Sequence, residues 1–199
     1  RGYTPIAFFP WLSLTGEALE MEKEIMRKPA IAAMPEETVI MDGDEDYSKT
    51  LEMVKQYDIV AVVVGSENGT LMGDRLAEDL GLKGNPTEFS EMHRDKHLMQ
   101  EGLKAAGMRT IKGTVVRSVE EAREFLDSND IANTVIKPVD GAGSVGLHFC
   151  NSREETLRTI ENNLGKGSFI ADPTKGLMLQ ERIVGDEYVV NTISCDGRH

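Results

Sequence analysis

The chain has 199 residues, of which 40% are apolar and 28% charged, a composition typical of folded proteins of one or two domains. Its formal net charge of −12 argues against partners that need a basic face, such as nucleic acids and anionic membranes. No apolar run approaches the ~20 residues of a membrane-spanning helix. Cys150 and Cys195 have no C-x-x-C spacing, which indicates reduced thiols and a cytoplasmic protein.

Residues 1–90 alternate between strand and helix patterns. Residues 5–10 and 37–42 are expected strands, and the β-branched run Asp58–Gly65 is typical of a central parallel strand covered on both faces. Apolar residues at helical spacing mark three expected helices: Ala18, Met21 and Ile25; Leu51 and Val54, ending near Tyr57; and Met72, Leu76 and Leu80. The alternation predicts an α/β fold with a Rossmann-like parallel sheet, with a further strand and helix before Arg1.

Residues 91–184 follow a loop at residues 84–86 and have a different pattern. The first expected helix begins near Ser90, has Met92, Met99, Leu103 and Ala106 on one face, and ends at Gly107. From residue 109 the order is β-α-β-β-α-β, with capping boxes formed by Ser118 with Glu121 and by Ser152 with Glu155. This order predicts a small antiparallel α+β unit, and residues 187–194 are expected to form one more strand.

A glycine loop follows the strand expected at residues 133–139. Gly141, Gly143 and Gly146 have the spacing G-x-G-x-x-G. A dinucleotide-binding turn requires a helix directly after the glycines and an acid ~20 residues further on, whereas this segment continues as a strand. The glycines therefore lie in a hairpin, where they let a ligand approach the backbone closely, and Lys137 adds a cation suited to a phosphate. The alternative is an ordinary flexible hairpin.

Three segments in order resemble the ATP-grasp superfamily: HRDKHLMQEGLKAAGM (93–108), VIKPVDGAGSVGLHFC (135–150) and LMLQERIVGDEYVVNTIS (177–194). Residues 81–96 and 180–194 look most like its amino-acid ligase branch. The resemblance implies a partial Rossmann-like pre-ATP-grasp domain at residues 1–90. It implies the opening helix and the α+β small (lid) subdomain of the grasp at residues 91–184. Residues 185–199 would be the first strand of a larger, truncated grasp subdomain.

The resemblance also implies an ATP-binding role for residues at matching positions. The phosphates would be contacted by Lys96 and Lys137 and covered by the backbone N–H groups of Gly143, Ser144 and Val145. The adenine would be lined by Gln180, Glu181 and Ile183, and the ribose would be held by Glu187. A carboxylate suits the ribose because its oxygens accept hydrogen bonds from a vicinal diol. Glu67 follows the strand expected at Asp58–Gly65 and is a candidate on the substrate side.

Structural roles are the alternative for these residues. Lys96 could be a solvated lysine on its helix, Glu187 could cap a turn, and Glu67 could cap a loop. Lys137 fits a structural role less well, because its neighbours would leave it without a partner in an apolar strand. His93 and His97 lie four residues apart without a glutamate between them, and no metal site is expected there.

The metal of this superfamily is Mg²⁺, held by carboxylates on strands that follow the ribose acid, so its ligands are expected beyond residue 199 and none within the chain. We therefore expect a fragment that binds ATP but shows no ligase turnover alone. Residues 187–194 are expected to remain poorly paired or to pair with a second copy, which leaves a homodimer open.

The resemblance implies an ATP-dependent carboxylate–amine ligase. In this reaction ATP phosphorylates a carboxylate, an amine attacks the acyl phosphate, and an amide, ADP and phosphate are released. The expected partners are small carboxylates and amines, in particular amino acids. Two alternatives are an ATP-grasp enzyme that uses bicarbonate, as in carboxylases or carbamoyl-phosphate-type enzymes, and a non-catalytic nucleotide-binding module.

Overall fold

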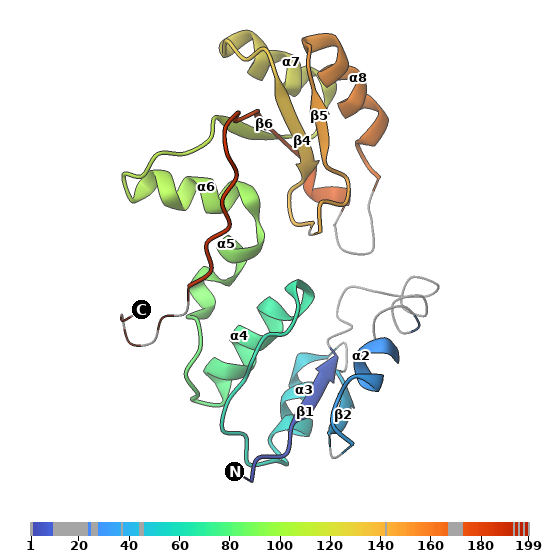
Figure 1. Cartoon of the computed structure of the whole chain (residues 1–199), viewed down its shortest axis with the longest axis vertical. Coiled ribbons are helices and arrows are strands. Elements are labelled where there is room, and N and C mark those ends of the chain that lie inside the picture. The colour runs from blue at the N-terminus through green and yellow to red at the C-terminus, as the bar shows by residue number, and fades with distance from the viewer. Residues whose placement is uncertain are drawn as a thin grey trace.

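The computed structural model describes residues 2–9, 24, 28–36, 38–43, 46–141, 143–166, 173–192, 194, 196 and 198. It has a mixed α/β architecture, with one sheet near the N-terminus and a second sheet in the C-terminal half (Figure 1). Within the described residues, no helix is both long enough and apolar enough to cross a membrane. The expected helix marked by Ala18, Met21 and Ile25 lies outside the described residues.

The N-terminal region contains a short parallel sheet. β1 (Ile6–Phe9) pairs in parallel with β2 (Val39–Asp42), as expected for a Rossmann-like arrangement. The helices of this region are α2 (Lys28–Ala32), α3 (Tyr47–Val54) and α4 (Thr70–Asp79), and the 3-10 turn η2 (Glu67–Gly69) precedes α4. Met41, Val54, Met72 and Leu76 are buried together, so β2, α3 and α4 share one apolar core.

The strand expected at Asp58–Gly65 does not form, which corrects the sequence prediction. Its backbone makes no strand pairing, and Val60 and Val63 are 55% and 85% exposed. Ile59 and Val62 do pack against the core formed by β2, α3 and α4. Valine favours a strand mainly because its side chain packs well on a pleated surface that other residues cover. This run has no paired strand beside it, so its valines contribute little stability to an extended conformation.

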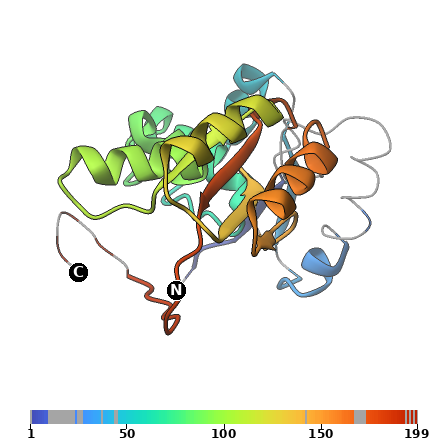
Figure 2. The same ribbon diagram turned by 90° about the horizontal axis from the view of Figure 1, so that it is seen from above.

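The C-terminal half confirms the predicted β-α-β-β-α-β order. Its strands are β3 (Gly113–Val116), β4 (Thr134–Pro138), β5 (His148–Cys150) and β6 (Leu177–Glu181), arranged as β3-β6-β4-β5 with every pairing antiparallel. α7 (Val119–Ser128) and α8 (Arg153–Asn163) pack on one face of this sheet (Figure 2). Val116, Ile136, Ile160 and Leu179 are fully buried between the two layers.

The two predicted helix caps are present. The hydroxyl oxygens of Ser118 and Ser152 accept hydrogen bonds of 3.1 Å from the backbone N–H groups of Glu121 and Glu155. The carboxylates of Glu121 and Glu155 accept from the backbone N–H groups of Arg117 and Asn151, which directly precede the serines. In a standard capping box the carboxylate accepts from the N–H of the serine itself. Both helices therefore begin at the residues that the sequence indicates.

Two short helices replace the single helix expected from Ser90 to Gly107. After the 3-10 turn η3 (Thr87–Phe89), α5 (Ser90–Arg94) ends and α6 (Lys96–Ala105) begins on either side of Asp95. Asp95 has an extended backbone (φ −86°, ψ 115°), and its carboxylate accepts from the N–H groups of His97 and Leu98. Aspartate favours this N-cap role over a helix interior, and the break places Lys96 at the first turn of α6.

The segment after β6 is extended and exposed. Residues 187–192 and 194 form no strand, and Tyr188, Val189 and Val190 are each at least 80% exposed. Figures 1 and 2 show this segment leaving β6 and running away from the sheet. The strand expected at residues 187–194 is therefore not formed at residues 187–192 and 194, which corrects that prediction. At these residues the segment is poorly paired, as expected.

We predict that a buried carboxylate in α4 stabilises the connection to α5. Asp74 is 3% exposed and accepts from the Ser90 hydroxyl at 2.6 Å and from the Asn85 amide at 3.1 Å. Asp74→Ala should lower the free energy of unfolding by about 2–3 kcal/mol, because the buried Ser90 hydroxyl and the exposed Asn85 amide lose a charged acceptor. The exposed carboxylate of Asp127, which pairs with Arg153, provides the control, and Asp127→Ala should cost no more than ~0.5 kcal/mol in urea unfolding. Equal losses for the two variants would contradict the prediction.

Candidate functional site

The glycine loop joins β4 to β5 through a turn with left-handed backbone. Gly143, Ser144 and Gly146 have φ values of +62°, +60° and +73°, and the N–H of Leu147 donates to the Ser144 carbonyl at 3.2 Å. A left-handed serine is uncommon, and such residues occur preferentially at functional sites. Residues 143–146 are all exposed, and a side chain at Gly143 would meet open space. The turn is therefore accessible to a ligand.

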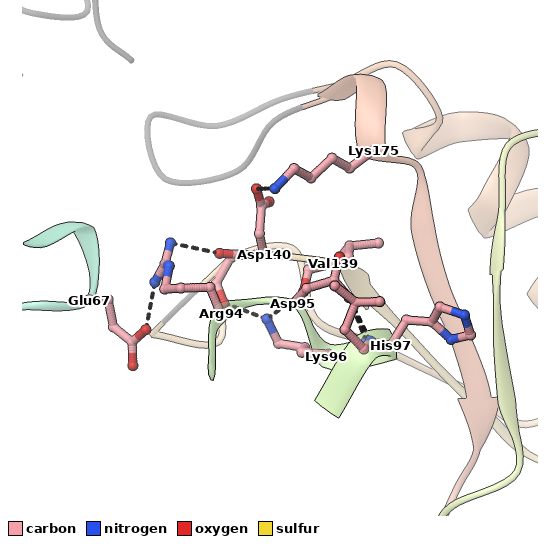
Figure 3. A network of polar contacts seen from close by, with 10 residues as sticks. Glu67, Arg94, Asp95, Lys96, His97, Val139, Asp140 and Lys175 are labelled. Atoms are coloured by element: carbon pink, nitrogen blue, oxygen red, sulfur yellow. Dashed lines mark hydrogen bonds and ion pairs between the residues drawn. The ribbon is translucent and has the colours of Figure 1, made fainter. Parts of the chain in front are cut away.

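Lys96 holds the root of the glycine loop, defined here as residues 139–141. Its Nζ donates to the carbonyl oxygens of Val139 at 3.2 Å and of Gly141 at 2.5 Å (Figure 3). Its backbone N–H also donates to the Val139 carbonyl, at 3.1 Å. The first turn of α6 is thus joined to the end of β4 by both the backbone and the side chain of Lys96.

Two further cations contact the loop root at Asp140. The guanidinium of Arg94 donates to the Asp140 carbonyl at 3.1 Å and forms an ion pair of 2.5 Å with the Glu67 carboxylate. Lys175 forms an ion pair of 3.1 Å with the Asp140 carboxylate. Figure 3 shows these side chains gathered around Asp140 from separate parts of the chain. Asp140 is therefore held through its backbone and its side chain.

Lys137 lies close to Lys96 on the face of the sheet turned away from α7 and α8. Ile136 and Leu179 face those helices, so the alternating residues Val135, Lys137 and Gln180 project from the opposite face. Among the described residues, the structure gives the Lys137 ammonium no hydrogen bond and no ion pair. A cation in this position is free to contact an anionic ligand.

Burial lowers the pKa of both lysines, and the charge of Lys137 lowers the pKa of Lys96 further. The pKa of Lys96 falls chiefly because its side chain is partly removed from water and then because of the charge of Lys137, while Asp140 opposes the shift. Partial burial alone lowers the pKa of Lys137. An anion bound between them would offset both effects, because it favours the charged form of each amine.

The end of β6 and the residues after it carry the positions that the resemblance assigns to the adenine. Gln180 is 4% exposed and lies opposite both Val135 in β4 and Gly113 in β3. The Glu181 carboxylate accepts from the N–H of Lys112 at 2.9 Å, so it is engaged with the segment before β3. Ile183 is 54% exposed. The Arg182 N–H still donates to the Asn133 carbonyl at 3.0 Å, and residues 182–190 after β6 are exposed.

The family follows from a comparison with known domains. The family model described as "Phosphoribosylglycinamide synthetase, ATP-grasp (A) domain" matches residues 94–199, more than half of the chain. The chain belongs to the ATP-grasp family. The match includes Lys96, Lys137, the glycine loop and β6, which are the parts brought together in the C-terminal half.

Relatives of this ATP-grasp chain include dapdiamide A synthase of Enterobacter agglomerans. It is 31% identical over 162 residues, which cover 81% of this chain and 38% of that protein. A D-alanine–D-alanine ligase of Oceanobacillus iheyensis is 28% identical over 146 residues, or 70% of this chain and 38% of that protein. The chain thus spans well under half of the length of these two relatives.

The fold is also similar to that of a solved ligase. The structure of D-alanine–D-alanine ligase from Bacillus anthracis complexed with ATP matches 92% of this chain and 60% of that chain, with a TM-score of 0.55 and 14% identity. At this identity the likeness concerns the fold alone. It agrees with the expected partial ATP-grasp architecture.

The predicted site residues fall into two groups in this ATP-grasp chain. Lys96, Lys137 and residues 143–145 lie around the glycine loop, and Gln180 shares with Lys137 the face of the sheet opposite α7 and α8. Glu67 reaches the loop root through Arg94. Glu187 lies on the exposed segment after β6, and no contact joins it to the loop root. Its ribose-binding role stays a prediction.

The sequence analysis did not identify Asp140 or the two cations that contact it, Arg94 and Lys175. Arg94 lies two residues before Lys96, and Asp140 directly precedes the glycines, so both are within the segments that carried the resemblance. Their contacts join residues that are 46 positions apart, as between Arg94 and Asp140, and no local pattern records such a contact. Among the described residues, no group of three or more His, Cys, Asp or Glu side chains could hold a metal ion.

We predict that affinity for polyphosphate begins to fall, as the pH rises, at a lower pH than it would if both lysines had their ordinary pKa. Both lysines must be protonated to attract the anion, so affinity is lost as the pH rises through their lowered pKa values. Calorimetric titration with tripolyphosphate between about pH 7 and about pH 10 measures this loss. The affinity should fall by up to about tenfold per pH unit for each proton that binding requires.

Lys137→Arg should reduce this pH dependence, because a guanidinium stays charged throughout the range. The matched control is Lys104→Arg on the exposed face of α6, which should leave the pH profile unchanged. A profile that is identical in wild type and Lys137→Arg would contradict the prediction.

Proposed function

We propose that this chain forms the nucleotide-binding part of an ATP-dependent ligase that joins a carboxylate to an amine. The observation that carries the proposal is the pair of partly buried lysines beside an exposed glycine loop, within a chain of the ATP-grasp family. Dapdiamide A synthase and D-alanine–D-alanine ligase support an amide-forming reaction by their names. Amino acids are the substrate class that we propose.

The proposed nucleotide lies on the face of the sheet opposite α7 and α8, beneath the glycine loop. Lys96 and Lys137 would contact the phosphates, and the N–H groups of residues 143–145 would cover them. Lysines suit this role because a mobile point charge can follow a phosphoryl group as it is transferred. Residues 180, 181 and 183 would line the adenine, in part through their backbone, and Glu187 would accept from the ribose hydroxyls.

The proposed reaction has two steps. A carboxylate oxygen of the first substrate attacks the γ-phosphorus of ATP, the bond to the β-phosphate oxygen breaks, and ADP leaves. The amine of the second substrate then attacks the acyl carbon, phosphate leaves, and the amine loses a proton. The chain's residues would contribute positioning and charge stabilisation, and the glycine loop would exclude water from the acyl phosphate when it covers the nucleotide.

Magnesium is proposed as the ion that accompanies ATP, as in phosphoryl transfer generally. The described residues do not offer a set of carboxylates that would hold it. We therefore assign no metal ligand in this chain. A cytoplasmic location is also proposed, and it is supported by the buried Cys150, which has no disulfide partner.

The experiment that tests this function measures phosphate release from Mg·ATP by the full-length protein. Single amino acids and amino-acid pairs are supplied as substrates, with bicarbonate as a control, and products are identified by mass spectrometry. Release that requires an amino-acid pair and yields a dipeptide supports the proposal. Release that depends on bicarbonate alone, or no release while ATP still binds, would contradict it.

We predict that Lys137→Gln raises the KM for ATP about tenfold to a hundredfold. A hydrogen bond to a charged group contributes about 1.5–3 kcal/mol, and this corresponds to that range of binding constants. Steady-state kinetics at varied ATP provides the measurement. Lys104→Gln, which removes an exposed lysine of α6, should leave the KM within about twofold of wild type. A KM for Lys137→Gln equal to that of the control would exclude the phosphate role.

A further inference from the structure

Arg94 connects three parts of the chain from a largely buried position. It is the last residue of α5, and its side chain is 12% exposed. One terminal nitrogen of its guanidinium donates to Glu67, which begins η2, and the other donates to the Asp140 carbonyl. Figure 3 shows the guanidinium between these two partners.

The guanidinium suits this double contact because of its shape. Its donors are fixed in one plane and point in different directions, so two partners on opposite sides can be held at a set separation. A lysine ammonium carries the same charge but is a single point on a flexible stem. Charge alone therefore does not reproduce the connection that Arg94 makes.

The loop root needs such a connection if Lys96 binds a phosphate. In this structure the Lys96 ammonium donates to the carbonyl oxygens of Val139 and Gly141. A phosphate oxygen that takes up the same ammonium competes with these two carbonyls for its donors. The contacts of Arg94 and Lys175 with Asp140 do not involve Lys96, so they can hold the root during this exchange.

The geometry points to Arg94 as a positioning residue, which fixes the root of the glycine loop relative to Glu67 while Lys96 exchanges carbonyl oxygens for nucleotide phosphates. Arg94 acts through the loop and touches no reacting atom. This inference rests on the proposed nucleotide site and adds to it a mechanical link between that site and the segment at Glu67.

The test compares Arg94→Lys and Arg94→Gln in the full-length protein. Affinity for a non-hydrolysable ATP analogue is measured by calorimetry, and the KM for ATP and kcat are measured separately. Both variants should lose about tenfold in nucleotide affinity, in the range of one charged hydrogen bond. Because geometry and not charge is required, Arg94→Lys should fail to restore the wild-type affinity.

A second measurement separates positioning from general stability. Hydrogen exchange of the peptide that covers residues 139–147, with the analogue bound, should become faster in both Arg94 variants. Glu67→Gln, which leaves the arginine in place and removes its ion pair, should cause a smaller loss of affinity, about threefold. Arg153→Lys is the matched control, because Arg153 pairs with Asp127 on α7 and lies outside the loop contacts.

The outcomes distinguish this inference from the proposed function. If wild type does not bind the analogue, the proposed function and the inference both fail. If wild type binds and Arg94→Lys matches it in affinity and loop exchange, only the role of Arg94 is overturned. Loss of affinity with accelerated exchange at residues 139–147, and no change in Arg153→Lys, supports the positioning role.

Discussion

The carbonyl oxygens at the root of the glycine loop determine how the candidate site is assembled. Val139, Asp140 and Gly141 leave the end of β4, and their carbonyls accept from Arg94 and Lys96. Backbone carbonyls without partners are costly when they are shielded from water, so these cations stabilise the point where the chain leaves the sheet. The same contacts bring the first turn of α6 against β4, and the proximity of Lys96 to Lys137 is a consequence.

The two faces of the C-terminal sheet have different roles. One face packs on α7 and α8 through fully buried residues such as Ile136, Ile160 and Leu179. Lys137 and Gln180 then necessarily project from the other face, because neighbouring residues in a strand alternate. A partly buried cation without an acceptor among the described residues has an unfavourable free energy. Relief of that cost by an anion would add to the anion's affinity.

The sequence predicted those features that depend on local chemistry. Ser118 and Ser152 cap their helices, and the β-α-β-β-α-β order is present, because caps and apolar periods act over a few residues. The strand predicted at Asp58–Gly65 is wrong, because a β-branched run forms a strand only where a neighbouring strand pairs with it. The break at Asp95 was missed, although aspartate is a strong N-cap residue. The contacts of Arg94 could not be predicted, since they depend on how α5, η2 and the loop meet.

Asp140 shows why the loop root needs several cations. A carboxylate next to a phosphate site repels the phosphate. The Asp140 carboxylate is paired with Lys175, and the Asp140 carbonyl accepts from Arg94. Around the loop root, Arg94, Lys96, Lys137 and Lys175 carry four positive charges, against three negative charges on Glu67, Asp95 and Asp140. This cluster is therefore positive by one charge in a chain whose net charge is −12. An acidic protein can attract a polyphosphate here because these acids already have partners.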